Sequence, residues 1–103
     1  LDGDAPALCA ARELEEEAGR RAGRLVPLAT IWTTPGFTDE RIWLYLARGL
    51  EPGRQDLQDD EALALERLPF GEALARALTG GIDDGKSIVA LLRAAAHLGV
   101  SPP

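Results

Sequence analysis

The 103-residue chain predicts an α/β sandwich, in which helices pack around a single sheet. Three observations support this prediction. A helical pattern begins the chain, two strand-like segments follow it between about residues 25 and 50, and two helical patterns end it. The sequence has no internal repeat and no low-complexity tract. A chain of this length can form one small domain, which buries a modest share of its surface.

The first predicted helix runs from about Ala5 to Ala18. Asp4 can accept hydrogen bonds from the first free backbone N–H groups, and Gly19 supplies the left-handed residue that often ends a helix. We expect one apolar face of this helix to rest on a sheet. That face consists of Leu8, Ala11 and Leu14.

The other face of this helix carries a cluster of carboxylates. Glu13, Glu16 and Glu17 sit at i, i+3 and i+4, so their side chains converge on one patch. Arg12 can reach Glu16 one turn further on. Hard divalent cations take several oxygen ligands, and clustered carboxylates repel one another unless a cation lies between them. The cluster therefore predicts a metal site, and the alternative on helix physics alone is an ordinary solvated acidic face.

Two strands are predicted after this helix. The first runs from Leu25 to Thr33, with Pro27 weakening its beginning, and a turn or irregular loop follows it. The second runs from Arg41 to Leu50 and is apolar on both faces, as a central strand requires. We expect Trp32 and Trp43 to be core residues, and the alternative is that they stack on a base.

The remainder of the chain predicts one more strand and two helices. Residues 49–60 form a surface loop, and residues 62–68 read as a short strand. The two helices run from about Phe70 to Leu78 and from about Asp84 to Leu98.

Composition excludes several classes of partner. The net charge of −6 and the pI near 4.7 argue against binding to nucleic acid or to an anionic membrane, because phosphate recognition needs a basic surface. A polyphosphate substrate would instead need Mg²⁺ as a bridge. We expect Cys9, the single cysteine, to be a small core residue, and one cysteine allows no disulfide within the chain. This fits a reducing cytoplasm, and no apolar run approaches the ~18 residues of a membrane span.

The segment from Arg12 to Gly19 resembles the core of the Nudix box. The pattern of that box is G-x5-E-x7-R-E-U-x-E-E-x-G-U, where U is bulky and apolar. Asp4 stands where the pattern has its first Glu, and Arg20 stands where an apolar residue is usual. The opening Gly would lie three residues before Leu1, so we expect the chain to begin inside the box. The residues that fall on the pattern are Arg12, Glu13, Leu14, Glu16, Glu17 and Gly19.

Three further segments resemble the ADP-ribose pyrophosphatase branch of the Nudix family. Pro35 lies sixteen residues after Gly19, and residues 35–40 resemble the proline-centred segment of that branch. Residues 59–65 and 81–87 are similar to its late acidic loop and to the start of its last helix. The resemblance implies that residues 1–103 are a partial Nudix domain, an α/β/α sandwich around a mixed sheet. We expect the N-terminal strands, and the dimer-forming domain that often precedes the box, to be missing.

The same resemblance implies a reaction. Water attacks the diphosphate of ADP-ribose in the presence of Mg²⁺ and yields AMP and ribose 5-phosphate, and Mn²⁺ is a possible substitute for Mg²⁺. The full-length protein is expected to be a homodimer. Two alternatives stay open: hydrolysis of another nucleoside diphosphate derivative, and a catalytically silent fragment or interaction module whose acidic patch contacts a basic partner.

The resemblance also implies roles for individual residues. Glu13 and Glu17 are the first choice of metal ligands, and Glu16 serves as a further ligand and as a catalytic residue. Glu61, in the late loop, is the candidate base or extra ligand, with Asp59 and Asp60 as substitutes. Arg12 orients Glu16 rather than contacting substrate. The candidate substrate contacts are Phe37, Thr38 and Glu40.

Overall fold

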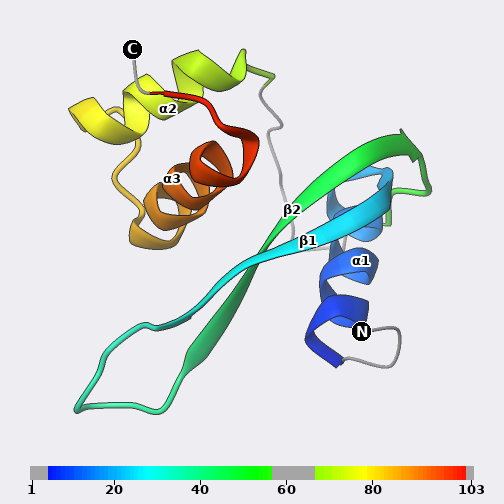
Figure 1. The fold of residues 1–103 in the computed structure, drawn as a ribbon. Helices are drawn as coiled ribbons and strands as arrows, with labels where there is room; N and C mark the ends of the chain where they lie inside the picture. The colour runs from blue at the N-terminus through cyan, green and yellow to red at the C-terminus, as the bar shows by residue number, and fades with distance from the viewer. Residues whose placement is uncertain (1–4, 57–66, 102–103) are drawn as a thin grey trace. The chain divides into compact units, whose positions relative to one another are not determined.

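The computed structural model describes residues 5–56 and 67–101 and confirms the predicted α/β class (Figure 1). In chain order the elements are α1 (Ala5–Ala18), β1 (Arg20–Trp32), β2 (Arg41–Pro52), α2 (Phe70–Thr79) and α3 (Gly85–Leu98). The chain divides into two compact units. The first contains residues 1–26 and 47–66, and the second contains residues 27–46 and 67–103.

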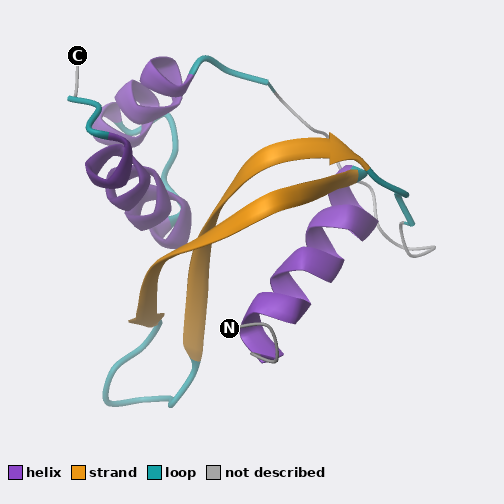
Figure 2. Cartoon of the chain, turned by 45° about the vertical axis from the view of Figure 1, so that its right-hand side comes forward, coloured by secondary structure: helices purple, strands orange, loops and turns teal. Residues whose placement is uncertain are grey.

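Helix α1 spans the predicted residues and ends at Ala18, and Gly19, which follows it, has a φ of 66° (Figure 2). The predicted cap, Asp4, lies outside the described residues. The predicted contact of its apolar face with a sheet is wrong, because no residue of α1 is buried and the side chain of Leu8 is 58% exposed. Within the described residues the sheet has two strands, and so narrow a sheet offers a helix little apolar surface.

Strands β1 and β2 are hydrogen-bonded neighbours and run antiparallel (Figure 1). The ladder is bracketed by two bonds: Gly53 N donates to Gly19 O at 2.9 Å, and Thr33 N donates to Glu40 O at 3.3 Å. The predicted start of the first strand at Leu25 is wrong, because β1 begins at Arg20. Pro27 lies inside this strand. A strand at a sheet edge tolerates proline, because its missing N–H group can face away from the ladder.

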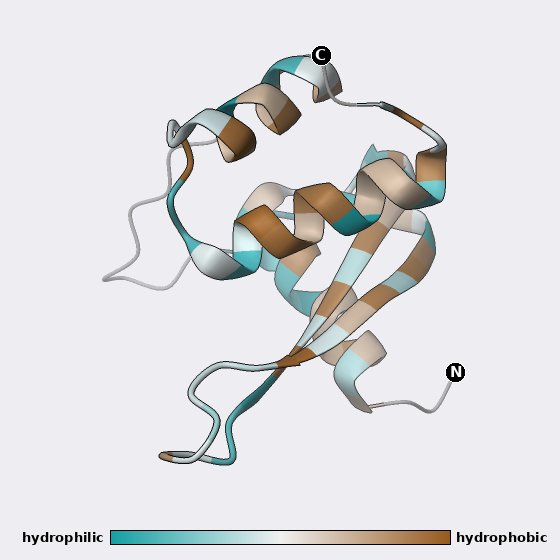
Figure 3. Cartoon of the chain, turned by 60° about the vertical axis from the view of Figure 1, so that its left-hand side comes forward, coloured by the Kyte–Doolittle hydropathy of each residue, from teal (hydrophilic) through white to brown (hydrophobic). Residues whose placement is uncertain are grey.

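The second predicted strand is confirmed and continues to Pro52. In Figure 3 strongly hydrophobic bands alternate with paler ones along parts of both strands, and residues 42–47 of β2 form a continuous run of aliphatic and aromatic side chains. The prediction that both tryptophans are core residues is wrong, since the side chains of Trp32 and Trp43 are 48% and 46% exposed. Among the described residues β2 has one neighbouring strand rather than two, which leaves its side chains less covered than those of a central strand.

Helices α2 and α3 confirm the two predicted C-terminal helices and pack against each other. Leu74 of α2 is completely buried, and three small side chains of the two helices are buried as well: Ala77, Ala94 and Ala95. Of the strand predicted at residues 62–68, residues 62–66 lie outside the described residues, and residues 67 and 68 are not in a strand. No helix in the described ranges is long and apolar enough to cross a lipid bilayer.

Leu74→Ala tests whether this buried leucine holds α2 in place. The substitution removes a fully buried side chain and leaves a cavity, so we expect the free energy of unfolding to fall by about 2–5 kcal/mol. Leu78→Ala, in the same helix, is the matched control because that side chain is 50% exposed. Urea unfolding of both variants measures the difference, and equal losses would contradict the packing described.

Candidate metal and substrate site

The acidic face of α1 carries the predicted metal ligands in the predicted register. Glu13, Glu16 and Glu17 lie on one uninterrupted helix. The predicted contact of Arg12 with Glu16 is present, with Nη1 of Arg12 3.2 Å from each carboxylate oxygen of Glu16. The hydrogen bond from this guanidinium to Glu16 raises the pKa of Arg12. Arg12 therefore restrains the Glu16 carboxylate, which is the geometry expected of an orienting residue.

Cys9 extends this row of contacts toward the start of the helix. Its Sγ donates to Oε1 of Glu13 at 3.3 Å and accepts from Nη2 of Arg12 at 3.6 Å. The prediction that Cys9 is a core residue is wrong, because its side chain is exposed. The position explains this result: Cys9 lies one turn before Glu13, and residues four apart share a helix face.

The donor set suits a hard divalent cation, because carboxylate oxygens are the ligands that Mg²⁺ and Ca²⁺ prefer. In the ranges that the structure describes, no three His, Cys, Asp or Glu side chains already converge as a metal cluster. Two of the three predicted ligands have other partners, since Glu16 pairs with Arg12 and Glu13 accepts from Cys9. Binding of a cation would therefore require rotation of side chains on the surface of α1, and the assigned roles stay predictions.

Sequence reasoning missed the contacts at the C-terminal end of α1. Oε2 of Glu15 accepts from Nε of Arg21 at 2.6 Å and from the backbone N–H of Arg54 at 3.1 Å. These two bonds, that of Arg21 first, lower the pKa of Glu15. The side-chain amide of Gln55 donates to Glu17 O at 2.9 Å. No local spacing signals contacts between residues about forty positions apart.

The same region of the first unit forms a polar pocket of about 540 Å³. Its walls come from the acidic face of α1, the beginning of β1 and the segment after β2. Its lining contains both guanidinium and carboxylate groups, so it offers both signs of charge to a ligand. The lining residues are Arg12, Glu15, Glu16, Arg21, Arg54, Gln55 and Asp56.

The three predicted substrate contacts lie together in the loop between β1 and β2. Phe37 is 88% exposed, and Thr38 N donates to Thr34 O at 3.1 Å. Oε1 of Glu40 accepts from Oγ1 of Thr33 at 2.7 Å, which ties the two sides of the loop together. The loop is thus held by hydrogen bonds and exposes the ring of Phe37 to solvent. The role of the loop in substrate binding stays a prediction. Glu61, with Asp59 and Asp60, lies outside the described residues.

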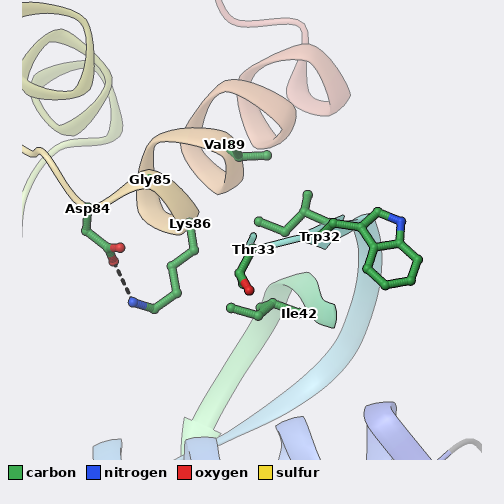
Figure 4. A pocket seen from close by; sticks show the side chains of 8 residues that line it. Trp32, Thr33, Ile42, Asp84, Gly85, Lys86 and Val89 are labelled. Carbon is green, nitrogen blue, oxygen red and sulfur yellow. Dashed lines mark hydrogen bonds and ion pairs between the residues drawn. The ribbon is translucent and has the colours of Figure 1, made fainter. Parts of the chain in front are cut away.

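A second pocket, of about 430 Å³, lies within the second unit (Figure 4). Ile31, Trp32 and Ile42 line it from the strands, and Lys86 and Val89 line it from α3. The Arg41 guanidinium lies 4.3 Å from the centre of the Trp32 ring, a cation–π contact.

Asp84, at the start of α3, organises the polar side of this second pocket. Its Oδ2 accepts from Nζ of Lys86 and from Oγ of Ser87, each at 2.8 Å. These hydrogen bonds, that of Lys86 first, lower the pKa of Asp84. The Lys86 ammonium and the Ser87 hydroxyl at the start of α3 therefore both donate to the Asp84 carboxylate.

Comparison with known proteins decides the family. The model of the NUDIX domain matches residues 1–91. The chain belongs to the Nudix family. It is 41% identical to the ADP-ribose pyrophosphatase of Mycobacterium tuberculosis over 92 residues, which cover 87% of this chain and 44% of that protein. It is also 32% identical to a GDP-mannose pyrophosphatase of Enterobacter over 94 residues, which cover 88% of this chain and 49% of that protein.

A third relative is not named as a pyrophosphatase, and one solved structure has the same fold as this chain. The chain is 38% identical to the methanol dehydrogenase activator of Bacillus methanolicus, over 86% of this chain and 49% of that protein. The crystal structure of an ADP compounds hydrolase matches 88% of this Nudix chain and 49% of its own, with a TM-score of 0.79 and 23% identity. The chain thus spans about half the length of the relatives it matches. Nudix hydrolases generally use divalent metal ions and act on nucleoside diphosphate substrates.

Asp84→Asn tests the ion pair at the start of α3. The folded-state pKa of Asp84 is lowered, so its ionised form stabilises the fold above the ordinary aspartate value of about 3.9. This contribution is lost as the pH falls through the folded-state pKa. We expect Asp84→Asn to destabilise the protein at pH 7 and to have little effect near pH 2. Denaturant unfolding at both pH values measures this, with the neighbouring exposed Asp83→Asn as control; the same pH dependence in both variants would refute the assignment.

Proposed function

We propose that this Nudix chain carries the metal-binding helix of an enzyme that hydrolyses ADP-ribose to AMP and ribose 5-phosphate with Mg²⁺. The observation that carries the proposal is α1 itself: the six box residues between Arg12 and Gly19 lie on one helix and its terminal glycine. The relative at 41% identity, named as an ADP-ribose pyrophosphatase, supports ADP-ribose as the substrate.

In this proposal Glu13 and Glu17 bind the cation and Glu16 provides a further carboxylate. When bound, Mg²⁺, or Mn²⁺ in its place, supplies Lewis-acid polarisation of the phosphoryl oxygen and a water of lowered pKa. The side chains of Glu13 and Glu17 are exposed, so they can turn toward a cation without breaking a buried contact.

Arg12 and Glu16 act as a pair in the proposed reaction. The two 3.2 Å contacts from Arg12 restrict the rotamers of Glu16, so its carboxylate is held ready to accept a proton from the attacking water. Glu61 is the second candidate for that base. Phe37, Thr38 and Glu40 contact the substrate from the loop between the strands, where Phe37 presents its ring to solvent.

We further propose that the full-length protein is a cytoplasmic homodimer.

A second substrate has specific support. Relatives named GDP-mannose pyrophosphatase match over 94 residues at 32–33% identity. ADP-ribose and GDP-mannose share a diphosphate between a nucleoside and a sugar, so the same carboxylates would serve either one.

A catalytically silent interaction module is the remaining alternative. It predicts weak divalent binding that weakens further with salt, whereas a bridging site binds Mn²⁺ saturably, near one or a few ions per chain.

Glu17→Gln is the test of the proposed enzyme. Loss of a ligand removes part of a charge stabilisation worth several kcal/mol, and each 1.4 kcal/mol is tenfold in rate. We therefore expect Mg²⁺-dependent AMP release from ADP-ribose to fall by about 100-fold or more. The free energy of unfolding should stay the same or rise slightly, because a charge leaves the negative end of the helix dipole.

The control for this test is Glu72→Gln, an exposed glutamate of α2 that pairs with Arg76. It removes the same charge from another helix and should leave the rate unchanged. GMP release from GDP-mannose, measured in parallel, decides between the two substrates. Full activity of Glu17→Gln would remove Glu17 from the metal site.

A further inference from the structure

The segment from Gly53 to Asp56 holds the C-terminal end of α1 in place. The last carbonyls of a helix lack partners within the helix and need them from elsewhere. Here Asp56 N donates to Glu16 O at 2.8 Å, and Nε2 of Gln55 donates to Glu17 O at 2.9 Å. The backbone carbonyls of Glu16 and Glu17, two of the three candidate ligands, are therefore bonded by residues that follow β2.

The side chain of Glu15 fixes this segment in turn. Its Oε2 accepts from the backbone N–H of Arg54 at 3.1 Å and from Nε of Arg21 at 2.6 Å. One carboxylate thus joins three parts of the first unit: the helix, the beginning of β1 and the segment after β2. The Glu15 side chain is only 27% exposed, whereas that of Arg12 is 61% exposed.

Gly53 lies close to the side chains of Glu15 and Arg21. A Cβ atom at position 53 would lie 2.9 Å from Oε2 of Glu15 and 3.1 Å from Cγ of Arg21. Contacts below 3.0 Å are essentially never seen for a real Cβ, so a side chain here would displace the Glu15 carboxylate, which as the end of a flexible side chain can move at little cost. A residue larger than glycine at position 53 would therefore move the Glu15 carboxylate away from its bonds to Arg54 N and Arg21.

We propose that Glu15 is a positioning residue of the metal site. Glu15 stands at the variable position x of R-E-U-x-E-E, between Leu14 and Glu16, so the box pattern itself gives it no role. By anchoring residues 53–56 it fixes the last turn of α1, and with it the direction in which the carboxylates of Glu16 and Glu17 leave the backbone. This inference rests on the proposed metal-dependent function. Partners that orient metal ligands typically change metal affinity by 10–100-fold when removed.

The test compares Glu15→Ala, Glu15→Gln and Glu72→Ala in the 103-residue chain. Mn²⁺ affinity is measured by electron paramagnetic resonance, and the melting temperature is measured beside it. We expect Glu15→Ala to weaken Mn²⁺ binding at least tenfold, and Glu15→Gln to restore part of the affinity because the amide oxygen can still accept from Arg54 N. Glu72→Ala removes an exposed partner of Arg76 and should leave Mn²⁺ affinity within twofold.

A second pair of variants reaches the same junction without touching a carboxylate. Gly53→Ala should weaken Mn²⁺ binding as Glu15→Ala does, whereas Gly71→Ala in α2 should not, because an added Cβ meets nothing within 4 Å there. Hydrogen exchange of the Asp56 amide, which bonds to Glu16 O, should accelerate in Glu15→Ala and Gly53→Ala only.

The outcomes separate this inference from the proposed function. Saturable Mn²⁺ binding by the parent chain that is unchanged in Glu15→Ala and Gly53→Ala would overturn the positioning role and leave the metal site intact. No saturable Mn²⁺ binding by the parent chain would overturn the metal-dependent function, and the positioning role with it. Weakened binding with faster exchange at Asp56, in both variants and in neither control, supports the inference.

Discussion

The geometry of the candidate site depends on which groups donate hydrogen bonds to the last backbone carbonyls of α1. A helix end leaves carbonyl groups without partners, and the last turn of α1, residues 15–18, contains no basic side chain. For Glu16 O and Glu17 O the partners come instead from Asp56 and Gln55, which follow the second strand. Formation of the hairpin and completion of the helix end are therefore coupled, because the residues that bond to the end of α1 directly follow β2.

This linkage explains why glycine occurs at both ends of the junction. Gly19 adopts a left-handed φ of 66° so that the chain can turn from α1 directly into β1. Its carbonyl then accepts from Gly53 N at 2.9 Å, which is the first bond of the strand ladder. At position 53 a Cβ atom would lie 2.9 Å from Oε2 of Glu15, so a larger residue would push this carboxylate out of its position.

Local signals in the sequence were sufficient to predict the helices, but they did not predict which side chains are buried. Helix propensity, periodicity and terminal glycines predicted α1, α2 and α3 to within one residue, and the i,i+4 spacing predicted the contact of Arg12 with Glu16. The errors concern neighbours in space. Burial of Leu8, Cys9 and the two tryptophans depends on what covers them, which periodicity does not specify. The role of Glu15 was missed for the same reason, since its partners include a residue 39 positions away.

The arrangement on α1 also shows why an acidic site can persist on a small domain. Glu16 and Glu17 lie in the last turn of α1, where an exposed negative charge at the negative end of the helix dipole costs roughly 0.3–1 kcal/mol. Glu13 and Glu17, four residues apart, also repel each other. No α1 side chain is buried, so water screens this repulsion and the cost stays low. Arg12 and Arg21 neutralise Glu16 and Glu15 from outside the last turn, while Glu17 keeps its charge on the surface. The fold therefore tolerates a carboxylate patch whose mutual repulsion a cation would relieve, and relief of that repulsion becomes part of the binding free energy for the cation.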